Sequence, residues 1–222
     1  MHLDTSNKPM VERALRIATS HHKGVFRRYT NEPYINHPVR VAEMLLLFGI
    51  VDQETLCAAL LHDCLEDKSA LGHTMNPRYI TEATNGRVLR WVELLTNSET
   101  GNRKARKAKA ALRIMNAPWQ VQAIKLCDIM DNCKGIAQHD PDFASVYLEE
   151  KRNMIGMIRR TPELTDMIDS AKDIVTDETN AVALWRLRTG KEEQAKQVRR
   201  DEEIEQIIAA EEQSVYSEVA IF

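Results

Sequence analysis

Residues 60–67 limit what this chain can fold into, because they place four ionisable side chains in an apolar run. The segment reads LLHDCLED and follows the apolar stretch TLCAA. An ionised carboxylate that is removed from water costs free energy unless a partner compensates it. On a helix of 3.6 residues per turn, His62, Asp63, Glu66 and Asp67 would stand at about 0°, 100°, 40° and 140°. The sequence therefore predicts one polar pocket near the end of an otherwise apolar helix.

The rest of the sequence shows apolar residues at helical spacing, interrupted by short breaks. Pro9 and Pro38 each stand where a first helical turn is expected, and Gly24 and Gly49 follow the ends of the same two patterns. Asp52 has the residue type and position of a helix N-cap. Further helical patterns cover residues 76–86, 86–97, 117–138 and 144–160. Because alternating β-branched runs are few, the sequence predicts an all-α fold, a helical bundle around the polar pocket.

Length and composition are those of an ordinary soluble protein. The chain has 222 residues, of which 43% are hydrophobic and 28% charged, enough for a domain with a sizeable core. The net charge of −3 argues against a nucleic-acid partner. No apolar run approaches the ~20 residues of a membrane span, and the start of the chain lacks the apolar segment of a signal peptide. We therefore expect a cytoplasmic protein without a membrane partner.

The character of the sequence changes after Pro162, where charges of both signs become frequent. We expect residues 1–175 to form one helical domain and residues 176–222 to form a charged helical extension. The thin apolar stripe of this extension consists of Val198, Ile204, Ile207 and Ile208. Such a stripe fits an exposed terminal helix, and it also fits pairing with another subunit, so homo-oligomer formation stays open.

The cysteines do not indicate a zinc finger or a disulfide framework. No two of them form a CxxC pair, and all lie inside helical patterns. We expect buried apolar side chains at these positions, as is common for free cysteine. The four positions are Cys57, Cys64, Cys127 and Cys133.

A divalent cation would compensate the carboxylates in the polar pocket. Imidazole and carboxylate together suit such an ion, whose charge stabilises the ionised acid. His62 and Asp63 are too few as ligands, and two further candidates are His37, in the proline-flanked stretch EPYINHP, and Asp128, in the apolar stretch IKLCDIMDN. These four residues would form a mononuclear site with mixed nitrogen and oxygen ligands. Its hardness favours manganese, iron or magnesium over a thiolate-type zinc site.

Two more acids stand close to the predicted ligands and have no need to bind the ion. Glu66 and Asp67 could take a proton from water and deliver one to a leaving oxygen. On the second apolar helix, Lys125 and Asn132 share a polar stripe with Asp128, at spacings i, i+3 and i+7. The combination is typical of a hydrolytic centre.

The other histidines carry no comparable pattern. His139 and Asp140 form a second His-Asp pair, but Asp140 precedes a proline and is interpreted as a helix cap without chemistry. His21, His22 and His73 lie at expected helix ends or loops, where we expect solvated side chains.

Three motifs, in this order, resemble a known family. They read HKGVFRRYTNEPYINHP, AALLHDCLED and IKLCDIMDN, and they are similar to motifs of the HD-domain hydrolases of the RelA/SpoT homologue group, which includes small stand-alone alarmone hydrolases. The resemblance covers roughly residues 10–155. It implies an all-helical, metal-dependent enzyme that removes the 3′-pyrophosphate from ppGpp or pppGpp, usually with manganese, as part of the stringent response.

The resemblance also implies a role for individual residues. The metal ligands would be His37, His62, Asp63 and Asp128, and the acidic pair Glu66 and Asp67 would activate water. Arg27 and Arg28 would lie near the base and phosphates, Asn132 would contact the nucleoside, and Tyr147 would line the same pocket. With the polar stripe included, the expected substrate-binding residues are Arg27, Arg28, Lys125, Asn132 and Tyr147.

The sequence departs from the family pattern on the substrate side. Val25 replaces a common glutamine, an extra residue precedes Glu32, and Lys68 replaces a threonine. Ile129 and Asp131 replace an arginine and, commonly, a histidine in the third motif. The predicted ligands and acids are intact, so these departures affect the expected nucleotide selectivity rather than the expected hydrolysis.

A basic run at residues 103–109 allows two interpretations. It would attract polyphosphates if it lay near the metal, because a positive rim accelerates encounter with an anionic substrate. It is equally typical of a solvated helix face.

The leading hypothesis is therefore a manganese-dependent enzyme that hydrolyses (p)ppGpp to GDP or GTP and pyrophosphate, with a small nucleotide as its partner. A related phosphohydrolase is the first alternative, acting on NADPH, adenine alarmones or nucleoside monophosphates. A non-catalytic module that senses a nucleotide is the second, and the retained Glu66 and Asp67 argue against it.

Overall fold

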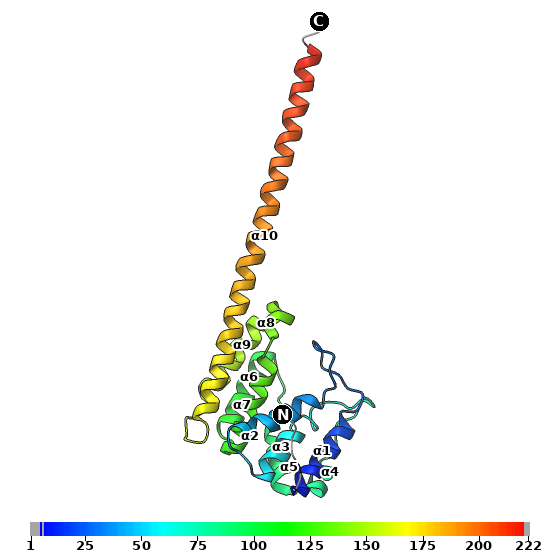
Figure 1. The fold of residues 1–222 in the computed structure, drawn as a ribbon, viewed down its shortest axis with the longest axis vertical. Helices are drawn as coiled ribbons and strands as arrows, with labels where there is room; N and C mark the ends of the chain where they lie inside the picture. Colours follow the sequence, from blue (N-terminus) through cyan, green and yellow to red (C-terminus); the bar gives the residue numbers. More distant parts are fainter. Residues whose placement is uncertain (1–4, 6, 220–222) are drawn as a thin grey trace. The chain divides into compact units, whose positions relative to one another are not determined.

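The computed structural model describes residue 5 and residues 7–219, with side-chain surroundings up to residue 200 except at 195 and 198 (Figure 1). Within these residues the secondary structure is helical, and the only β pairing is an isolated bridge between Phe26 and Pro33. The prediction of an all-α fold is confirmed. No helix in the described ranges is sufficiently long and apolar to span a bilayer.

The helices follow most of the predicted patterns, but the helix predicted over residues 117–138 is divided in two, because Gly135 takes a left-handed backbone conformation with φ 79°. They are α1 (Pro9–His21), α2 (Asn36–Leu47), α3 (Gln53–Leu61), α4 (Pro77–Ala83), α5 (Gly86–Leu95), α6 (Arg103–Met115), α7 (Trp119–Cys133), α8 (Ile136–His139), α9 (Pro141–Met157) and α10 (Thr165–Val219).

Two compact units divide the chain. The first ends at Thr179 and contains α1–α9 with the start of α10, and the second begins at Asn180. The second unit is helical, and Leu184 and Leu187 expose about two thirds of their surface. The side chains of the predicted stripe at 198–208 lie outside the described residues. A domain boundary after residue 175 stays a prediction.

Helix α3 lies at the centre of the first unit. Every residue from Thr55 to Leu61 is completely buried, and the helix packs against α1, α2, α5 and α7. Small side chains such as Ala58 and Ala59 let neighbouring helices approach closely, while Leu60 and Leu61 fill the remaining space. A helix that is apolar on all sides is the expected core element of such a bundle.

Helix α7 is the second buried helix and carries polar groups into the interior. It packs against α2, α3, α5, α6 and α9, and its residues from Val121 to Ile124 are buried. Asp128 is 4% exposed and lies among buried apolar neighbours such as Leu126 and Ile129. All four cysteines are buried and unbridged, as predicted.

Polar residues cap several helix starts, where backbone N–H groups lack intrahelical partners. The Asp52 side chain accepts a hydrogen bond from the Thr55 N–H at 2.9 Å, which confirms the predicted N-cap of α3. Similar caps are provided by Asn76, Asn85, Asn102 and Asp140.

The prediction that the helix continues to residue 67 is wrong. Helix α3 ends at Leu61, and His62 is its C-cap residue. The following backbone forms turns, with the Cys64 N–H donating to the Leu61 carbonyl and the Glu66 N–H to the Asp63 carbonyl. The Asp67 N–H keeps an i to i−4 bond to the Asp63 carbonyl, but the i to i−3 bonds interrupt the helix, so the polar cluster sits in a turn rather than on one side of a cylinder.

Candidate metal centre

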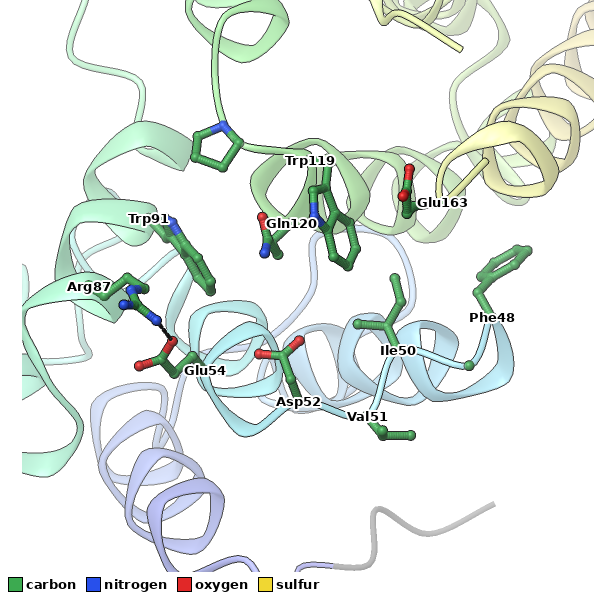
Figure 2. A pocket seen from close by; sticks show the side chains of 12 residues that line it. Phe48, Ile50, Val51, Asp52, Glu54, Arg87, Trp91, Trp119, Gln120 and Glu163 are labelled. Carbon is green, nitrogen blue, oxygen red and sulfur yellow. Dashed lines mark hydrogen bonds and ion pairs between the residues drawn. The ribbon is translucent and has the colours of Figure 1, made fainter. Parts of the chain in front are cut away.

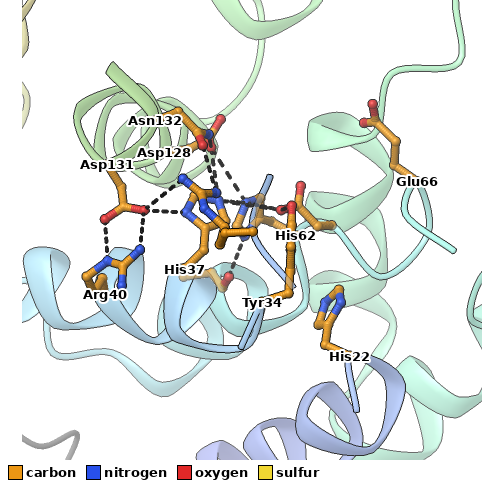
Figure 3. A network of polar contacts seen from close by, with 12 residues as sticks. His22, Tyr34, His37, Arg40, His62, Glu66, Asp128, Asp131 and Asn132 are labelled. Atoms are coloured by element: carbon orange, nitrogen blue, oxygen red, sulfur yellow. Dashed lines mark hydrogen bonds and ion pairs between the residues drawn. The ribbon is translucent and has the colours of Figure 1, made fainter. Parts of the chain in front are cut away.

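Two histidines meet at the centre of the candidate site (Figure 3). His37 lies in the first turn of α2, and His62 follows the last residue of α3. Both side chains are buried, and their Nε2 atoms lie 3.2 Å apart. This separation suits two adjacent ligands of one metal ion, whose bonds to imidazole nitrogen are about 2.1 Å long.

Two carboxylates approach the same point. Asp63 Oδ2 lies 3.0 Å from His62 Nε2 and 3.5 Å from His37 Nε2. Asp128 Oδ1, from α7, lies 3.3 Å from His37 Nε2 and 3.8 Å from His62 Nε2. The ligand atoms of His37, His62 and Asp63 all lie within 4.8 Å of one another. The structure therefore brings the four predicted ligands together.

Hydrogen bonds on the far side of each ring fix how the two imidazoles can act. His62 Nδ1 lies 2.7 Å from the Ala59 carbonyl oxygen, and His37 Nδ1 lies 2.6 Å from Asp131 Oδ2. Both acceptors require a proton on Nδ1, so each neutral ring turns an Nε2 lone pair toward the other. Two lone pairs cannot form a hydrogen bond with each other. A cation resolves this conflict, and the donor set fits a divalent ion.

The electrostatics of the four residues favour a positive charge at their centre. Burial by itself lowers the pKa of His62, but the carboxylates of Asp63 and Asp128 outweigh burial and raise the pKa well above its usual value. Burial raises the pKa of Asp128, but Lys125 and the two histidines outweigh it and hold the pKa well below its usual value. The acids are therefore ionised, and a proton and a metal ion would compete for the same place.

Behind Asp128, a chain of polar contacts leads toward Arg27. Lys125 Nζ donates to Asp128 Oδ2 at 2.6 Å, and Asn132 Nδ2 donates to Asp128 Oδ1. Arg27 Nη1 in turn donates to Asn132 Oδ1 at 2.9 Å. Two of the predicted substrate-binding residues thus bond directly to a predicted ligand, and Arg27 is connected to it through Asn132.

Asp67 lies beside the centre, close to a tyrosine that the sequence analysis did not single out. The Tyr34 hydroxyl donates to Asp63 Oδ2 at 2.8 Å. Burial and the neighbouring Asp63 carboxylate raise the pKa of Asp67, whereas Tyr34 lowers it. The Asp67 carboxyl group is therefore half-buried, next to a candidate ligand, and more basic than a free aspartate.

Glu66 points away from the two histidines, as Figure 3 shows. Its side chain is exposed, and its carboxylate accepts hydrogen bonds from the Asn97 backbone N–H at 2.9 Å and from Asn97 Nδ2 at 3.0 Å. The structure thus separates the two acids that were expected to act as a pair, with Asp67 inside the site and Glu66 at its edge.

A cavity of about 240 Å³ opens among the predicted substrate-binding residues. Arg27, Arg28, Asn132 and Tyr147 line it, as does the aromatic ring of Phe143. Lys125, the fifth predicted substrate-binding residue, does not line this cavity and instead donates to Asp128. Cationic and aromatic groups on the walls suit an anionic ligand with a planar ring.

A larger cavity, of about 900 Å³, lies elsewhere in the first unit (Figure 2). Its lining includes Phe48, Trp91 and Trp119, and an ion pair between Glu54 and Arg87 closes one side. None of the four candidate ligands lines either cavity, but Tyr34 and Asn132, which hydrogen-bond to Asp63 and Asp128, line the smaller one. Chemistry therefore favours the smaller cavity as the functional one. Trp91 is buried and Trp119 half-buried, which agrees with packing roles.

The structure supports one interpretation of the remaining histidines and corrects another. Asp140 accepts a hydrogen bond from the Phe143 N–H and caps α9, as predicted. His22 was expected to be solvated, but it is only 2% exposed. Its ring packs against Tyr34, with ring centroids 4.8 Å apart, because the turn after α1 folds the ring onto the edge of the site.

His37 is held in place by a group of residues for which the sequence predicted no role. Asp131 accepts from His37 and is itself held by Arg40, whose Nε lies 2.6 Å from Asp131 Oδ1. Arg40 also donates to both carboxylate oxygens of Glu32, each at 2.9 Å. The spacing of Asp131, three residues after Asp128, was the available signal, since i, i+3 residues share a helix face.

The fold and the site together define a class of protein, an all-α domain with a buried histidine–aspartate centre. Residues 14–153 match the family model described as HD domain. The chain belongs to the HD domain family.

Curated relatives match a part of their own length. A guanosine-3′,5′-bis(diphosphate) 3′-pyrophosphohydrolase of Aquifex aeolicus is 34% identical over 149 residues, which cover 66% of this chain and 19% of the relative. The bifunctional (p)ppGpp synthase/hydrolase SpoT of Escherichia coli is 33% identical over 138 residues, or 60% of this chain and 19% of the relative. This chain thus spans about a fifth of the length of these relatives.

Solved structures share the fold at lower sequence identity. A metazoan ortholog of SpoT, described as hydrolysing ppGpp, has a TM-score of 0.66 at 20% identity and covers 76% of this chain and 94% of its own. A protein of Listeria monocytogenes has a TM-score of 0.57 at 22% identity, covering 69% of this chain and 99% of its own.

Proposed function

We propose that this protein is a metal-dependent hydrolase that removes the 3′-pyrophosphate of ppGpp or pppGpp and releases GDP or GTP. The observation that carries the proposal is the convergence of two imidazole Nε2 atoms and two carboxylates on one point. The named activity of the Aquifex aeolicus relative supports the choice of reaction and substrate.

His37, His62, Asp63 and Asp128 would hold the ion, and we propose Mn²⁺ as that ion. A set of two imidazoles and two carboxylates is harder than a thiolate site, which favours manganese over zinc. When bound, the ion would polarise a phosphoryl oxygen and make water more acidic. Fixing the Nδ1 protons of both rings keeps the Nε2 lone pairs available for this role.

Asp67 is proposed as the group that accepts the proton of the attacking water. Its raised pKa makes it a better base than an ordinary aspartate, and Tyr34 restrains the carboxylates around it. Glu66 is proposed as the second acid of the pair. Because Asn97 holds Glu66 at the edge of the site, we assign the larger share of proton transfer to Asp67.

The cavity beside the centre is proposed to bind the nucleotide. Arg27 and Arg28 would face its phosphates and base, and Asn132 would contact the nucleoside. Tyr147 offers a ring for the base, and Lys125 would act through Asp128, to which it donates a hydrogen bond. These assignments follow the family motifs and the chemistry of the cavity walls.

Three broader features of the protein are also proposed. Residues 1–175 would form the catalytic domain, with residues 176–222 as an extension that allows self-association. The enzyme would act in the stringent response, in keeping with the (p)ppGpp-metabolising names of its relatives. Its four free, buried cysteines suit the reducing cytoplasm.

A metal-supplemented nucleotide assay tests the proposal. Wild-type protein with Mn²⁺ is expected to release pyrophosphate from ppGpp, and the Asp63→Ala variant is expected to be inactive because it lacks one ligand. The assay scores pyrophosphate against phosphate, since cleavage at the 3′ position yields pyrophosphate. Wild-type protein with verified metal content that leaves ppGpp intact would overturn the proposal.

Asp131 supports a second candidate, a related phosphohydrolase with another nucleotide substrate. This residue departs from the family pattern, and its Oδ2 lies 3.7 Å from Arg27 Nη2. The negative charge therefore moderates the cationic cavity wall, which changes the phosphate pattern that the wall would prefer. The same assay with NADPH, adenine alarmones and nucleoside monophosphates separates the two candidates. Binding without turnover of any of them would indicate a nucleotide sensor.

A further inference from the structure

Lys151 is a buried cation that has no counter-ion among the described residues. It lies on α9 and is 7% exposed. Its ammonium takes part in no hydrogen bond or ion pair with the described residues, and it stands over the Tyr147 ring, with Nζ 4.6 Å from the ring centroid. Removing an ammonium from water without a partner costs stability. An unpaired buried cation of this kind is typical of a group that binds an anionic ligand.

The Lys151 ammonium keeps access to solvent. The described side-chain polar atoms that are both fully enclosed and unpaired belong to His22, Thr55 and Thr161. Lys151 Nζ has no hydrogen bond to the described residues and yet is not one of these atoms, so it keeps some exposure to solvent, although Lys151 itself is not among the residues that line the cavity. Tyr147, whose ring lies under the ammonium, lines the cavity beside the metal centre.

Positive charge gathers around Lys151 from two neighbouring helices. Lys107 on α6 and Lys125 on α7 both act on Lys151 electrostatically. Among these three lysines, Lys125 donates to a described carboxylate, that of Asp128. Burial first of all, and then Lys125 and Lys107, lower the pKa of Lys151 to about 8 against the opposing effect of Asp128. The three lysines together carry more positive charge than the carboxylate of Asp128 neutralises.

We infer that Lys151 is a phosphate-binding residue whose ammonium receives an oxygen of the substrate's diphosphate group. The inference rests on the proposed function, because that function brings a diphosphate to the metal centre beside Asp128. An ammonium is a compact charge with three donors, suited to a phosphate oxygen. The Tyr147 ring supports it from below, and half-buried Lys107 adds a second positive charge.

Three substitutions test this inference in the full-length protein as purified. Lys151→Met removes the charge at similar size, Lys151→Arg keeps the charge, and Lys172→Met is the matched control, because Lys172 is an exposed lysine on α10. Isothermal titration calorimetry with inorganic pyrophosphate, at one fixed metal concentration, reports binding directly. Steady-state kinetics with ppGpp separate KM from kcat, and a thermal melt reports stability.

Lys151→Met is expected to weaken pyrophosphate binding by about 10- to 100-fold, the range for losing a charge-assisted hydrogen bond. The KM for ppGpp should rise by a similar factor, with a smaller change in kcat. Lys151→Arg should recover part of the affinity, and Lys172→Met should match the wild type. The Tm of Lys151→Met should equal or exceed that of the wild type, because an unpaired buried charge is removed.

Two results would overturn the inference. The first is that Lys151→Met binds pyrophosphate with wild-type affinity. The second is that Lys151→Met has a lowered Tm and a binding defect, and that Lys151→Arg shows the same defect. The proposed function is tested separately. If the wild type fails to cleave ppGpp while Lys151→Met loses pyrophosphate binding, the function falls and the phosphate site stands. If the wild type cleaves ppGpp and Lys151→Met binds pyrophosphate with wild-type affinity, the function stands and the phosphate site falls.

Discussion

His37 Nδ1 lies 2.6 Å from Asp131 Oδ2, so a carboxylate on α7 orients an imidazole on α2 toward the metal centre. Burial alone would raise the pKa of Asp131, but His37 and Arg40 outweigh it and lower the pKa to about 2. The carboxylate is therefore ionised at any physiological pH. It keeps the proton of His37 on Nδ1 and leaves Nε2 free to bind a metal ion.

Replacing Asp131 is expected to weaken metal binding. Asp131→Asn removes the charge that orients His37, and losing such an outer partner of a metal-bound histidine typically lowers metal affinity by about 10- to 100-fold. Competition with a chelating dye measures the affinity for Mn²⁺. Asp142→Asn, at an exposed position in the first turn of α9, is the control. Equal affinities for the two variants would show that Asp131 has no such role.

Adding Mn²⁺ is expected to raise the thermal midpoint of the wild type. An ion that binds only the folded chain stabilises it by about 2.7 kcal/mol at a concentration 100 times its Kd. Asp63→Asn should lose most of this shift, because Asp63 Oδ2 approaches both histidines. Differential scanning calorimetry over a series of Mn²⁺ concentrations gives the comparison. An equal shift in both proteins would place the ion elsewhere.

The two acids are expected to contribute unequally to turnover. Asp67→Asn should lower kcat by about 100- to 10,000-fold, the usual range for removing a general base. Glu66→Gln should have a smaller effect, because Asn97 holds Glu66 away from the histidines. Metal content is measured in parallel, so that loss of the ion is not mistaken for loss of the base. A larger effect at Glu66 would contradict the assignment to Asp67.

His22 is expected to make the fold less stable in mild acid. Burial, followed by the neighbouring His21, lowers the pKa of His22 from 6.5 to about 4, and its Nδ1 is enclosed without an acceptor for a second proton. Between these two values the unfolded chain binds a proton that the folded chain does not. The free energy of unfolding therefore falls as the pH falls from 6.5 to 4, by about 1.4 kcal/mol per pH unit and about 3 kcal/mol in all.

Urea unfolding of the wild type and of His22→Gln checks this pH dependence. Both proteins are measured between pH 5 and 7 in the same metal-free buffer, so that the other histidines contribute equally. The wild type should lose stability more steeply toward low pH than the variant. Parallel curves for the two proteins would show that His22 titrates normally in the folded chain.

The fold could be predicted because local signals and core packing agree. The apolar run before His62 and the Asp52 cap both indicate the helix that became α3, and the structure has that helix with that cap. The end of α3 was misplaced by several residues. Apolar and polar residues continue beyond Leu61 at helical spacing, and only the backbone shows that turns follow, with i to i−3 hydrogen bonds at Cys64 and Glu66.

The site could be predicted only in part, because residue types suggest chemistry but do not give orientation. Adjacent positions such as Glu66 and Asp67 look equivalent in the sequence, yet the hydrogen bonds of Glu66 to Asn97 turn it away. That contact joins residues 31 apart in the chain and leaves no local signal. The same holds for Tyr34 and Asp131, whose partners lie 29 and 94 residues away in the chain.

The position of each candidate ligand along its helix has a consequence for assembly of the chain. His37 lies in the first turn of α2, His62 follows the last residue of α3, and Asp128 lies inside α7, so the three meet only after all three helices have docked. An ion bound to them would act as a removable cross-link. It would close the loop between His37 and His62, which are 25 residues apart, together with a much longer loop to α7. Since the entropy of loop closure grows only with the logarithm of length, the longer loop would cost only slightly more to close than the shorter one, although it holds far more of the chain.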